Sequence, residues 1–388
     1  MKILVLFFCF ICFEVKALEL DIRSNNAIMY NMDSNEILFE KDSDSRVMIA
    51  SLTKVMTALI TLENVDDLDK QIVVNYDDLK GLSEKNLVTA GFTSYETVTY
   101  RDLLYGLLLP SGADAAQVLE RNVNDNFIDL MNEKAKKLNL SNTHFTNSIG
   151  LDDENNYSSV RDFSILFKEA LKNQDFKTVI TSKEYVTSDG KLKFKSTIKS
   201  NASKYNIDIP YVLGGKTGTT DGAGLCLASI GEANGVNYLL VTTGAIYDKI
   251  GPHHLEDAKV IYDFFINNYG NHLIVDKRIS YKTLKTKYSK QKSVKLYPKK
   301  DIVKYLPNDY SKDDVIFKYD GTSEVTPFTS KNLGTLKIYY KDKLLSKEKV
   351  ILKKKIKFSL IVFLKENIYV VGIIVSLLLF LSVRKILK

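Results

Sequence analysis

The sequence predicts an α+β protein: a large domain of mixed helices and strands, a small all-β domain, and a C-terminal transmembrane helix. Three observations predict this class. Helix and strand patterns mix without a regular βαβ rhythm as far as about residue 270. Short strand patterns separated by lysine-rich stretches follow from residue 271. An uncharged apolar stretch occupies residues 368–383.

Composition and charge exclude a disordered chain and a nucleic-acid-binding protein. The chain has 388 residues, of which 45% are hydrophobic and 26% charged, so it is globular rather than disordered. Lysine and arginine minus aspartate and glutamate gives −11 for residues 18–270, +10 for 271–350 and +7 for 351–388. An acidic main domain binds phosphate poorly, so we expect no nucleic-acid partner. A basic region beside an apolar end instead favours contact with membrane lipid.

The N-terminus has the pattern of a secretory signal. Met1 and Lys2 precede an apolar run from Ile3 to Phe13, and Ala17 offers a cleavage point. We therefore expect residues 1–17 to be a signal peptide, the alternative being a buried first strand. A lipoprotein signal at Cys12 fits less well because bulky Ile11 precedes it. Removal of Cys9 and Cys12 would leave Cys226 alone, so no internal disulfide is expected.

Residues 18–270 form the larger predicted domain. A hairpin is expected first, because two short apolar runs flank Asp33-Ser34-Asn35. A helix with a long apolar face is expected from Ser51. Residues 141–162 are rich in Asn, Ser and Asp and predict a long loop. The remaining elements are helices at 103–109, 115–119, 127–138 and 255–265, and strands at 212–230, interrupted by glycines, and 238–243.

Residues 271–350 form the predicted small β domain, with strands at 273–279, 294–297, 315–319 and 333–340. A basic juxtamembrane segment, 351–367, leads to the predicted anchor at 368–383 and a cytoplasmic tail at 384–388. Sixteen uncharged residues span about 24 Å, slightly short of the hydrocarbon core of about 30 Å, and Lys365 is placed to snorkel. The alternative is an amphipathic surface helix, but residues 368–383 lack a polar face.

The first chemical motif is Ser51-Leu52-Thr53-Lys54. On a helix the first and fourth residues share a face, so the hydroxyl and the amine can meet. The same spacing occurs elsewhere, for example at Ser346 and Lys349, because the chain is rich in both residue types. Ser51 differs because it opens an apolar helix. A lysine base must be neutral part of the time, which requires desolvation or a nearby cation.

Two further elements follow. Gly214-Gly215-Lys216-Thr217-Gly218-Thr219-Thr220 allows a ligand close to the backbone and favours an edge strand, although a plain glycine-rich hairpin is the simpler interpretation. The spacing of a phosphate-binding P-loop is absent. Pro110-Ser111-Gly112 places Ser111 on a turn between helices.

The order and spacing of these three elements resemble the penicillin-recognising serine enzymes. Within that group the chain is similar to the D-alanyl-D-alanine carboxypeptidases, the low-mass penicillin-binding proteins of serine peptidase family S11. Further stretches share the likeness, which covers roughly residues 20–350: Val55-Met56-Thr57, Leu108-Leu109, Asn142-Thr143-His144-Phe145, Gly150-Leu151-Asp152, residues 157–162 and Ala223-Gly224.

The resemblance implies a β-lactamase/transpeptidase-like catalytic domain, with a mostly antiparallel sheet flanked by helices. It implies that Ser51 attacks the penultimate D-Ala carbonyl of a peptidoglycan stem peptide and that Lys54 takes its proton. Ser111 would relay a proton to the departing D-Ala, and the backbone N–H groups of Ser51 and Thr219 would hold the oxyanion. The implied substrate-binding residues are Lys216, Thr217, Gly218, Thr219 and His254. No cofactor or metal is implied, and β-lactam antibiotics would be covalent inhibitors.

Two positions depart from the family pattern. Ala113 stands where the family usually has Asn, and His254 where it often has an arginine that binds the substrate carboxylate. Both departures concern substrate affinity rather than reaction type. Three alternatives remain: a β-lactamase, although the chain contains no Glu-x-x-Leu-Asn pentad; a non-catalytic wall-binding protein; and a membrane-anchored peptide hydrolase acting outside the wall.

Overall fold

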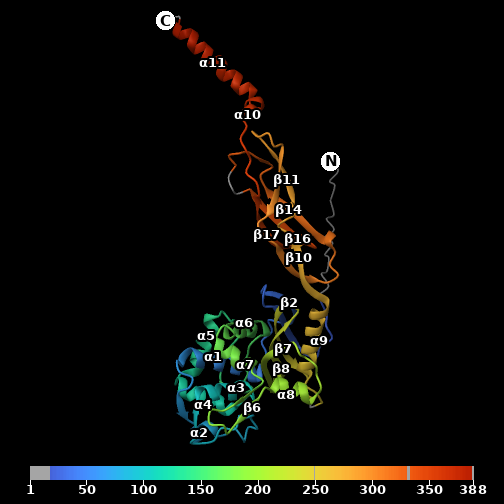
Figure 1. The fold of residues 1–388 in the computed structure, drawn as a ribbon. Coiled ribbons are helices and arrows are strands. Elements are labelled where there is room, and N and C mark those ends of the chain that lie inside the picture. The colour runs from blue at the N-terminus through green and yellow to red at the C-terminus, as the bar shows by residue number, and fades with distance from the viewer. Residues whose placement is uncertain (1–17, 249, 330–332, 387–388) are drawn as a thin grey trace, which may run out of the picture. The chain divides into compact units, whose positions relative to one another are not determined.

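The computed structural model describes residues 18–248, 250–329 and 333–386. The predicted signal peptide, with Cys9 and Cys12, lies outside the described residues. The chain divides into two compact units between Phe264 and Phe265 (Figure 1). The fold is the predicted one: an α+β transpeptidase-like domain, a β domain and a long apolar C-terminal helix.

The first unit is built on a five-stranded antiparallel sheet in the order β2-β1-β9-β8-β7. The predicted hairpin and the predicted strand at 238–243 are confirmed as parts of it. The single strand predicted at 212–230 is instead two paired strands, because the chain turns at residues 221–223. Because β7 is at one edge, its outer side has no partner strand in this sheet. The strands are β1 (Asn26–Asn31), β2 (Glu36–Lys41), β7 (Val212–Thr220), β8 (Gly224–Ala233) and β9 (Val236–Ala245).

Helices cover both faces of this sheet (Figure 1). On one face, Ala228 and Ile230 of β8 join the core formed by the helices that surround α1. On the other, Ser229 meets Tyr262 of α9 (His253–Asn268), with 3.2 Å between the hydroxyl oxygens. The remaining elements are η1 (Ala50–Thr53), α1 (Lys54–Asn64), β3 (Gln71–Val73), α2 (Tyr76–Leu79), β4 (Thr97–Thr99), α3 (Tyr100–Leu108), α4 (Ala113–Val123), α5 (Phe127–Lys137), α6 (Val160–Ala170), α7 (Gln174–Thr181), β5 (Glu184–Val186), β6 (Lys193–Lys195) and α8 (Thr197–Lys204).

Two further boundaries that bear on the site differ from the sequence prediction. Ser51 does not open an α-helix directly, because residues 50–53 form a 3₁₀ turn and α1 begins at Lys54. The loop expected to residue 162 ends earlier. The Ser159 side chain accepts a hydrogen bond from the Asp162 N–H and thereby caps α6 from Val160.

The second unit contains a six-stranded sheet in the order β14-β16-β17-β12-β11-β15, and a separate pair, β10 and β13. Four of its strands, β11, β13, β15 and β17, lie outside the four strands that the sequence predicts. They are strands because alternate positions, such as Leu284 and Val350, are buried. The strands are β10 (Tyr269–Val275), β11 (Lys282–Thr286), β12 (Ser293–Pro298), β13 (Ile302–Pro307), β14 (Val315–Gly321), β15 (Glu324–Val325), β16 (Gly334–Tyr340) and β17 (Lys343–Leu352), with η2 (Lys312–Asp314) between β13 and β14.

The strand predicted at 273–279 ends at Val275, because the Asp276 carboxylate accepts the Arg278 N–H at 2.7 Å and turns the chain. The C-terminal segment forms α10 (Leu360–Glu366) and α11 (Ile368–Ile386). The stretch Ile368–Lys385 has a mean hydropathy of 2.0 and is 0% buried. It is consistent with a membrane anchor.

Candidate active site

Ser51 and Lys54 meet as their spacing predicts. Lys54 Nζ lies 3.0 Å from Ser51 Oγ and donates a second hydrogen bond to the Ile149 carbonyl at 2.7 Å. The 3₁₀ turn leaves Ser51 half-buried, while the Lys54 side chain is 1% exposed. The hydroxyl is therefore accessible and the amine beside it is shielded from water.

Burial tunes the Lys54 amine for proton transfer. Desolvation lowers the pKa of Lys54 from 10.5 to about 7, and the Asp114 carboxylate partly opposes this by favouring the charged form. A substantial fraction of the amine is therefore neutral at pH 7. This is the property that a lysine base requires, and only the packing of the domain supplies it.

The loop at 147–151 positions Lys54. The Asn147 side-chain oxygen accepts the N–H groups of Ile149, Gly150 and Leu151, at 3.2, 2.7 and 3.0 Å, and fixes the carbonyl that receives Lys54. Gly150 has φ +90°, and a Cβ there would lie 2.0 Å from the Ala50 carbonyl oxygen. Sequence reasoning noted Gly150-Leu151-Asp152 without giving it a role, and it missed Asn147.

Ser111 pairs with the lysine of the glycine-rich strand. Lys216 Nζ donates to Ser111 Oγ at 2.8 Å and to the Thr217 carbonyl at 2.6 Å. Desolvation and the positive charge of Lys54 lower the pKa of Lys216 well below 10.5, which places the two amines in one electrostatic environment. Ser111 has φ +72°, a backbone conformation that side-chain-bearing residues rarely adopt.

Strand β7 passes directly beside the serine turn. A Cβ on Gly218 would lie 3.0 Å from Ser51 N and 3.1 Å from Ala50 Cβ, so glycine is needed for this approach. Thr217 Oγ1 contacts Thr197 Oγ1 at 2.8 Å, a partner that sequence reasoning missed. Thr219 follows Gly218 on the same edge strand.

The Asp114 carboxylate holds the loop at 90–92. It accepts the N–H groups of Ala90, Gly91 and Phe92 at 2.8, 2.9 and 3.1 Å. Its neighbour Ala113 is 1% exposed. Because both Asp114 oxygens are occupied by backbone donors, this side chain does not replace the amide expected at position 113.

Comparison with known proteins decides the family. The family model described as D-alanyl-D-alanine carboxypeptidase, peptidase S11, matches residues 13–246. The chain belongs to this family.

The carboxypeptidase is 30% identical over 286 residues to D-alanyl-D-alanine carboxypeptidase DacF of Bacillus subtilis, covering 72% of this chain and 71% of that protein. It is 33% identical over 216 residues to the D-alanyl-D-alanine carboxypeptidase of Streptomyces sp. strain K15, covering 51% and 72%. The crystal structure of the Streptomyces K15 DD-transpeptidase matches with a TM-score of 0.57 at 28% identity, covering 64% of this chain and 98% of that one.

Penicillin binding protein 5 of Haemophilus influenzae matches more of the fold, with a TM-score of 0.64 over 88% of this chain and 99% of that one. At 20% identity this likeness shows the fold alone. The protein is a serine D-Ala-D-Ala carboxypeptidase that acts on peptidoglycan.

His254 is held apart from the contacts described above. Its side chain is 3% exposed, and neither ring nitrogen has a hydrogen-bond partner within the described part of the chain. Burial, reinforced by neighbouring His253, lowers the pKa of His254 to about 4. The ring is therefore neutral at pH 7 and offers a carboxylate no positive charge.

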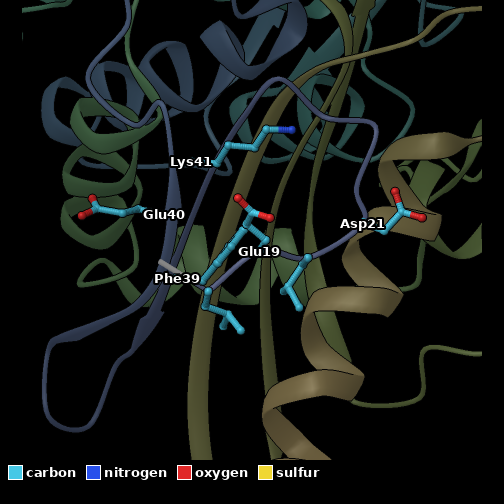
Figure 2. Close-up of a pocket in the computed structure, with 7 residues that line it drawn as sticks. Glu19, Asp21, Phe39, Glu40 and Lys41 are labelled. Carbon is cyan, nitrogen blue, oxygen red and sulfur yellow. The ribbon is translucent and has the colours of Figure 1, made fainter. Parts of the chain in front are cut away.

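A pocket of about 650 Å³ lies at the opposite edge of the sheet from β7, between residues 18–21 and β2 (Figure 2). Three acidic residues, Glu19, Asp21 and Glu40, and one lysine, Lys41, are among the residues that line it. None of the site residues predicted from the sequence lines it. The groups predicted for catalysis gather instead beside the edge strand β7.

Proposed function

We propose that Ser51 is the nucleophile of this carboxypeptidase and that Lys54 is its general base. The observation that carries the proposal is the 3.0 Å contact between Lys54 Nζ and Ser51 Oγ, made by a desolvated amine with a pKa of about 7. In this scheme neutral Lys54 takes the hydroxyl proton as Ser51 Oγ bonds to the penultimate D-Ala carbonyl carbon.

The remaining steps use the neighbouring groups. The backbone N–H groups of Ser51 and Thr219 donate to the oxyanion, which the close approach at Gly218 supports. Lys54 gives up the proton that it took, and Ser111 relays it to the leaving amine as the C–N bond breaks. D-Ala leaves, and the acyl-enzyme remains on Ser51. Water then adds to the ester carbonyl, giving the shortened stem peptide and restoring the hydroxyl.

Substrate recognition is assigned to the open edge of β7. An extended stem peptide pairs with this edge, and Lys216 and Thr217 face its terminal carboxylate. Lys216 is buried against Ser111, so it reaches the substrate from beneath as a hydrogen-bond donor, while Thr217 and Thr219 offer hydroxyl groups. We assign His254 no charged contact with the carboxylate, because its ring is neutral.

The domain arrangement and location are also proposed. Residues 1–17 are removed on export, and the catalytic domain (18–270), the β domain (271–350) and the segment 351–367 lie on the extracytoplasmic side. Residues 368–383 cross the cytoplasmic membrane, with Arg384 and Lys385 on the cytoplasmic side. β-Lactams acylate Ser51, and lipid surrounds the anchor.

Labelling with a fluorescent penicillin tests the nucleophile. Membranes containing the wild type are expected to show a labelled band at a mass below the 44.0 kDa of the full chain, because the signal peptide is removed. Ser51→Ala is expected to abolish this band. Ser346→Ala is the matched control, because Ser346 and Lys349 have the same spacing on β17 in the second unit. A band that persists in Ser51→Ala, or disappears in Ser346→Ala, would contradict the assignment.

A further inference from the structure

Three neighbouring strands of the β domain present one face to solvent. Along β16 and β17, Leu336, Ile338 and Val350 are buried in the domain core. Because side chains alternate between the two faces of a strand, Lys337, Lys347 and their equivalents point away from the core. The strand register therefore determines which groups this outer face displays.

Lysines line up across this face. Lys318 of β14 is directly opposite Lys337 of β16, which is directly opposite Lys347 of β17. Lys349, two residues along β17, also points outward and is opposite Thr335. We call these four residues, Lys318, Lys337, Lys347 and Lys349, the lysine face.

Acidic residues do not balance this charge. Among the outward positions of β14, β16 and β17, Asp320 is the one carboxylate, and it accepts from Lys337 Nζ at 2.7 Å. Like charges directly opposite one another destabilise a sheet. The row of lysines therefore costs folding free energy unless an anion lies across it. An aromatic ring lies within the row, because Lys318 Nζ is 5.1 Å from the centre of the Tyr339 ring.

The position of the lysine face along the strands decides between a lipid surface and a polymer. Helix α10 is fixed to Tyr288, whose carbonyl accepts the Ser359 N–H at 2.9 Å and whose N–H donates to the Glu366 carboxylate at 2.9 Å. Because α10 leads directly into α11, this is the membrane end of the domain if α11 is the proposed anchor.

The lysine face is remote from that end. Along β17, Leu352 lies five residues beyond Lys347 and is opposite Leu296 of β12. In the same direction β12 continues for three more residues to Ser293, where it meets the turn that contains Tyr288. Eight steps of about 3.3 Å give about 26 Å along the strands. Charges further apart than about 8–10 Å are largely screened at physiological salt. Lipid headgroups at the α10 end are therefore outside the reach of this row.

We propose that the lysine face binds a linear polyanion of the cell envelope, one that carries a phosphate or carboxylate group on each repeat. Strands about 4.8 Å apart place Lys318, Lys337 and Lys347 on a line of about 10 Å, which an extended chain of anions can follow. Such binding would hold the enzyme on the polymer network that contains its substrate. It lies outside the catalytic unit, so it is independent of the proposed catalytic residues.

Binding of inorganic polyphosphate tests the proposal. The full chain is placed in phosphatidylcholine nanodiscs, and Kd for labelled polyphosphate is measured over a salt series. The face variant carries Lys318→Gln, Lys347→Gln and Lys349→Gln, which spares the Lys337–Asp320 pair. The control variant carries Lys290→Gln, Lys299→Gln and Lys312→Gln, three exposed lysines of the same domain with the same change in charge.

The face variant is expected to bind at least tenfold more weakly at low salt. The slope of log affinity against log salt should fall by about 2, since each lost contact to a single-stranded polyanion contributes about 0.7. The control variant should stay within about twofold of the wild type, and D-Ala release from a soluble peptide should be equal in all three. Equal losses in both variants, or absence of polyphosphate binding by the wild type, would overturn the proposal.

A second measurement separates polymer from lipid. Acetylation of Lys347 and Lys349 is followed by mass spectrometry in nanodiscs of phosphatidylcholine or phosphatidylglycerol. Protection is expected only when polyphosphate is added. Protection by phosphatidylglycerol alone would show that the face lies on lipid, which would refute the placement argued from the register.

Discussion

Replacing Lys54 by methionine should abolish catalysis and stabilise the folded protein near neutral pH. Methionine has a similar length and no charge, and the site is 1% exposed. The folded pKa of Lys54 lies below its ordinary value, so the unfolded chain binds more protons between about pH 7 and pH 10.5. Lys54 therefore lowers the free energy of unfolding by its full amount below pH 7, and this loss disappears as the pH rises toward 10.5.

The magnitude follows from the two pKa values. At pH 7 proton binding by Lys54 stabilises the unfolded chain by about 5 kcal/mol but the folded chain by only about 0.4 kcal/mol. The difference lowers the free energy of unfolding by about 4 kcal/mol. The variant also loses the hydrogen bonds to Ser51 and Ile149 and leaves the Ile149 carbonyl unpaired, which costs about 2–3 kcal/mol. The net gain at pH 7 is about 2 kcal/mol, or roughly 4–8 °C in Tm.

The sign should reverse at high pH. At pH 10 the ionisation cost of Lys54 falls to about 1 kcal/mol, so the lost hydrogen bonds dominate and the variant becomes the less stable protein. Thermal melts of both proteins at pH 7 and pH 10, in one detergent and at one salt concentration, measure this. A Tm difference that is the same at both pH values would refute the argument that burial holds the Lys54 pKa low.

Four further predictions concern the same site. Lys54→Arg should eliminate penicillin acylation, because a guanidinium stays protonated and cannot act as a base, and labelling at the wild-type rate would remove Lys54 from that role. In the wild type the acylation rate should rise with pH, up to tenfold per pH unit, and level off above about pH 7 as the amine loses its proton; a rate that is flat from pH 5 to 8 would contradict this. Asp114→Asn should move that rise to lower pH, since the carboxylate raises the Lys54 pKa, and should lower the free energy of unfolding by about 1–3 kcal/mol through the lost loop contacts; an unmoved profile would show that the charge is not felt. Gly218→Ala should lower kcat for D-Ala release at least tenfold with little change in Tm, because the added methyl would lie 3.0 Å from Ser51 N, and an unchanged kcat would show that this approach does not matter.

The contact between Ser51 and Lys54 could be predicted from their spacing in the sequence. Ser51 and Lys54 are three residues apart, so any turn of helix or 3₁₀ conformation brings them to one side. At this motif the sequence interpretation was wrong in beginning an α-helix at Ser51, because propensity does not distinguish a 3₁₀ turn from the first turn of a helix. In the β domain the lysine-rich strands were missed because their charged residues conceal the alternating buried positions.

Long-range contacts were beyond the sequence. The Ile149 carbonyl reaches Lys54 across 95 residues and Lys216 reaches Ser111 across 105, and no local pattern encodes either distance. Asn147 escaped notice because an asparagine in a polar loop has no local signature that separates a structural acceptor from a solvated side chain. His254 was placed at the substrate by resemblance alone, whereas its burial and neutrality depend on the packing around α9.

The sequence by itself determined the order of the three motifs, the division into an acidic and a basic part, and the apolar C-terminal segment, because each is a property of neighbouring residues or of composition. The tertiary structure alone decided that Lys54 is dry enough to titrate near pH 7, that Gly218 passes beside Ser51, and that three lysines share one row of a sheet. The physical reason is the same in each case. Desolvation, close backbone approach and strand register are set by segments that are distant in the chain and meet only when the chain is folded.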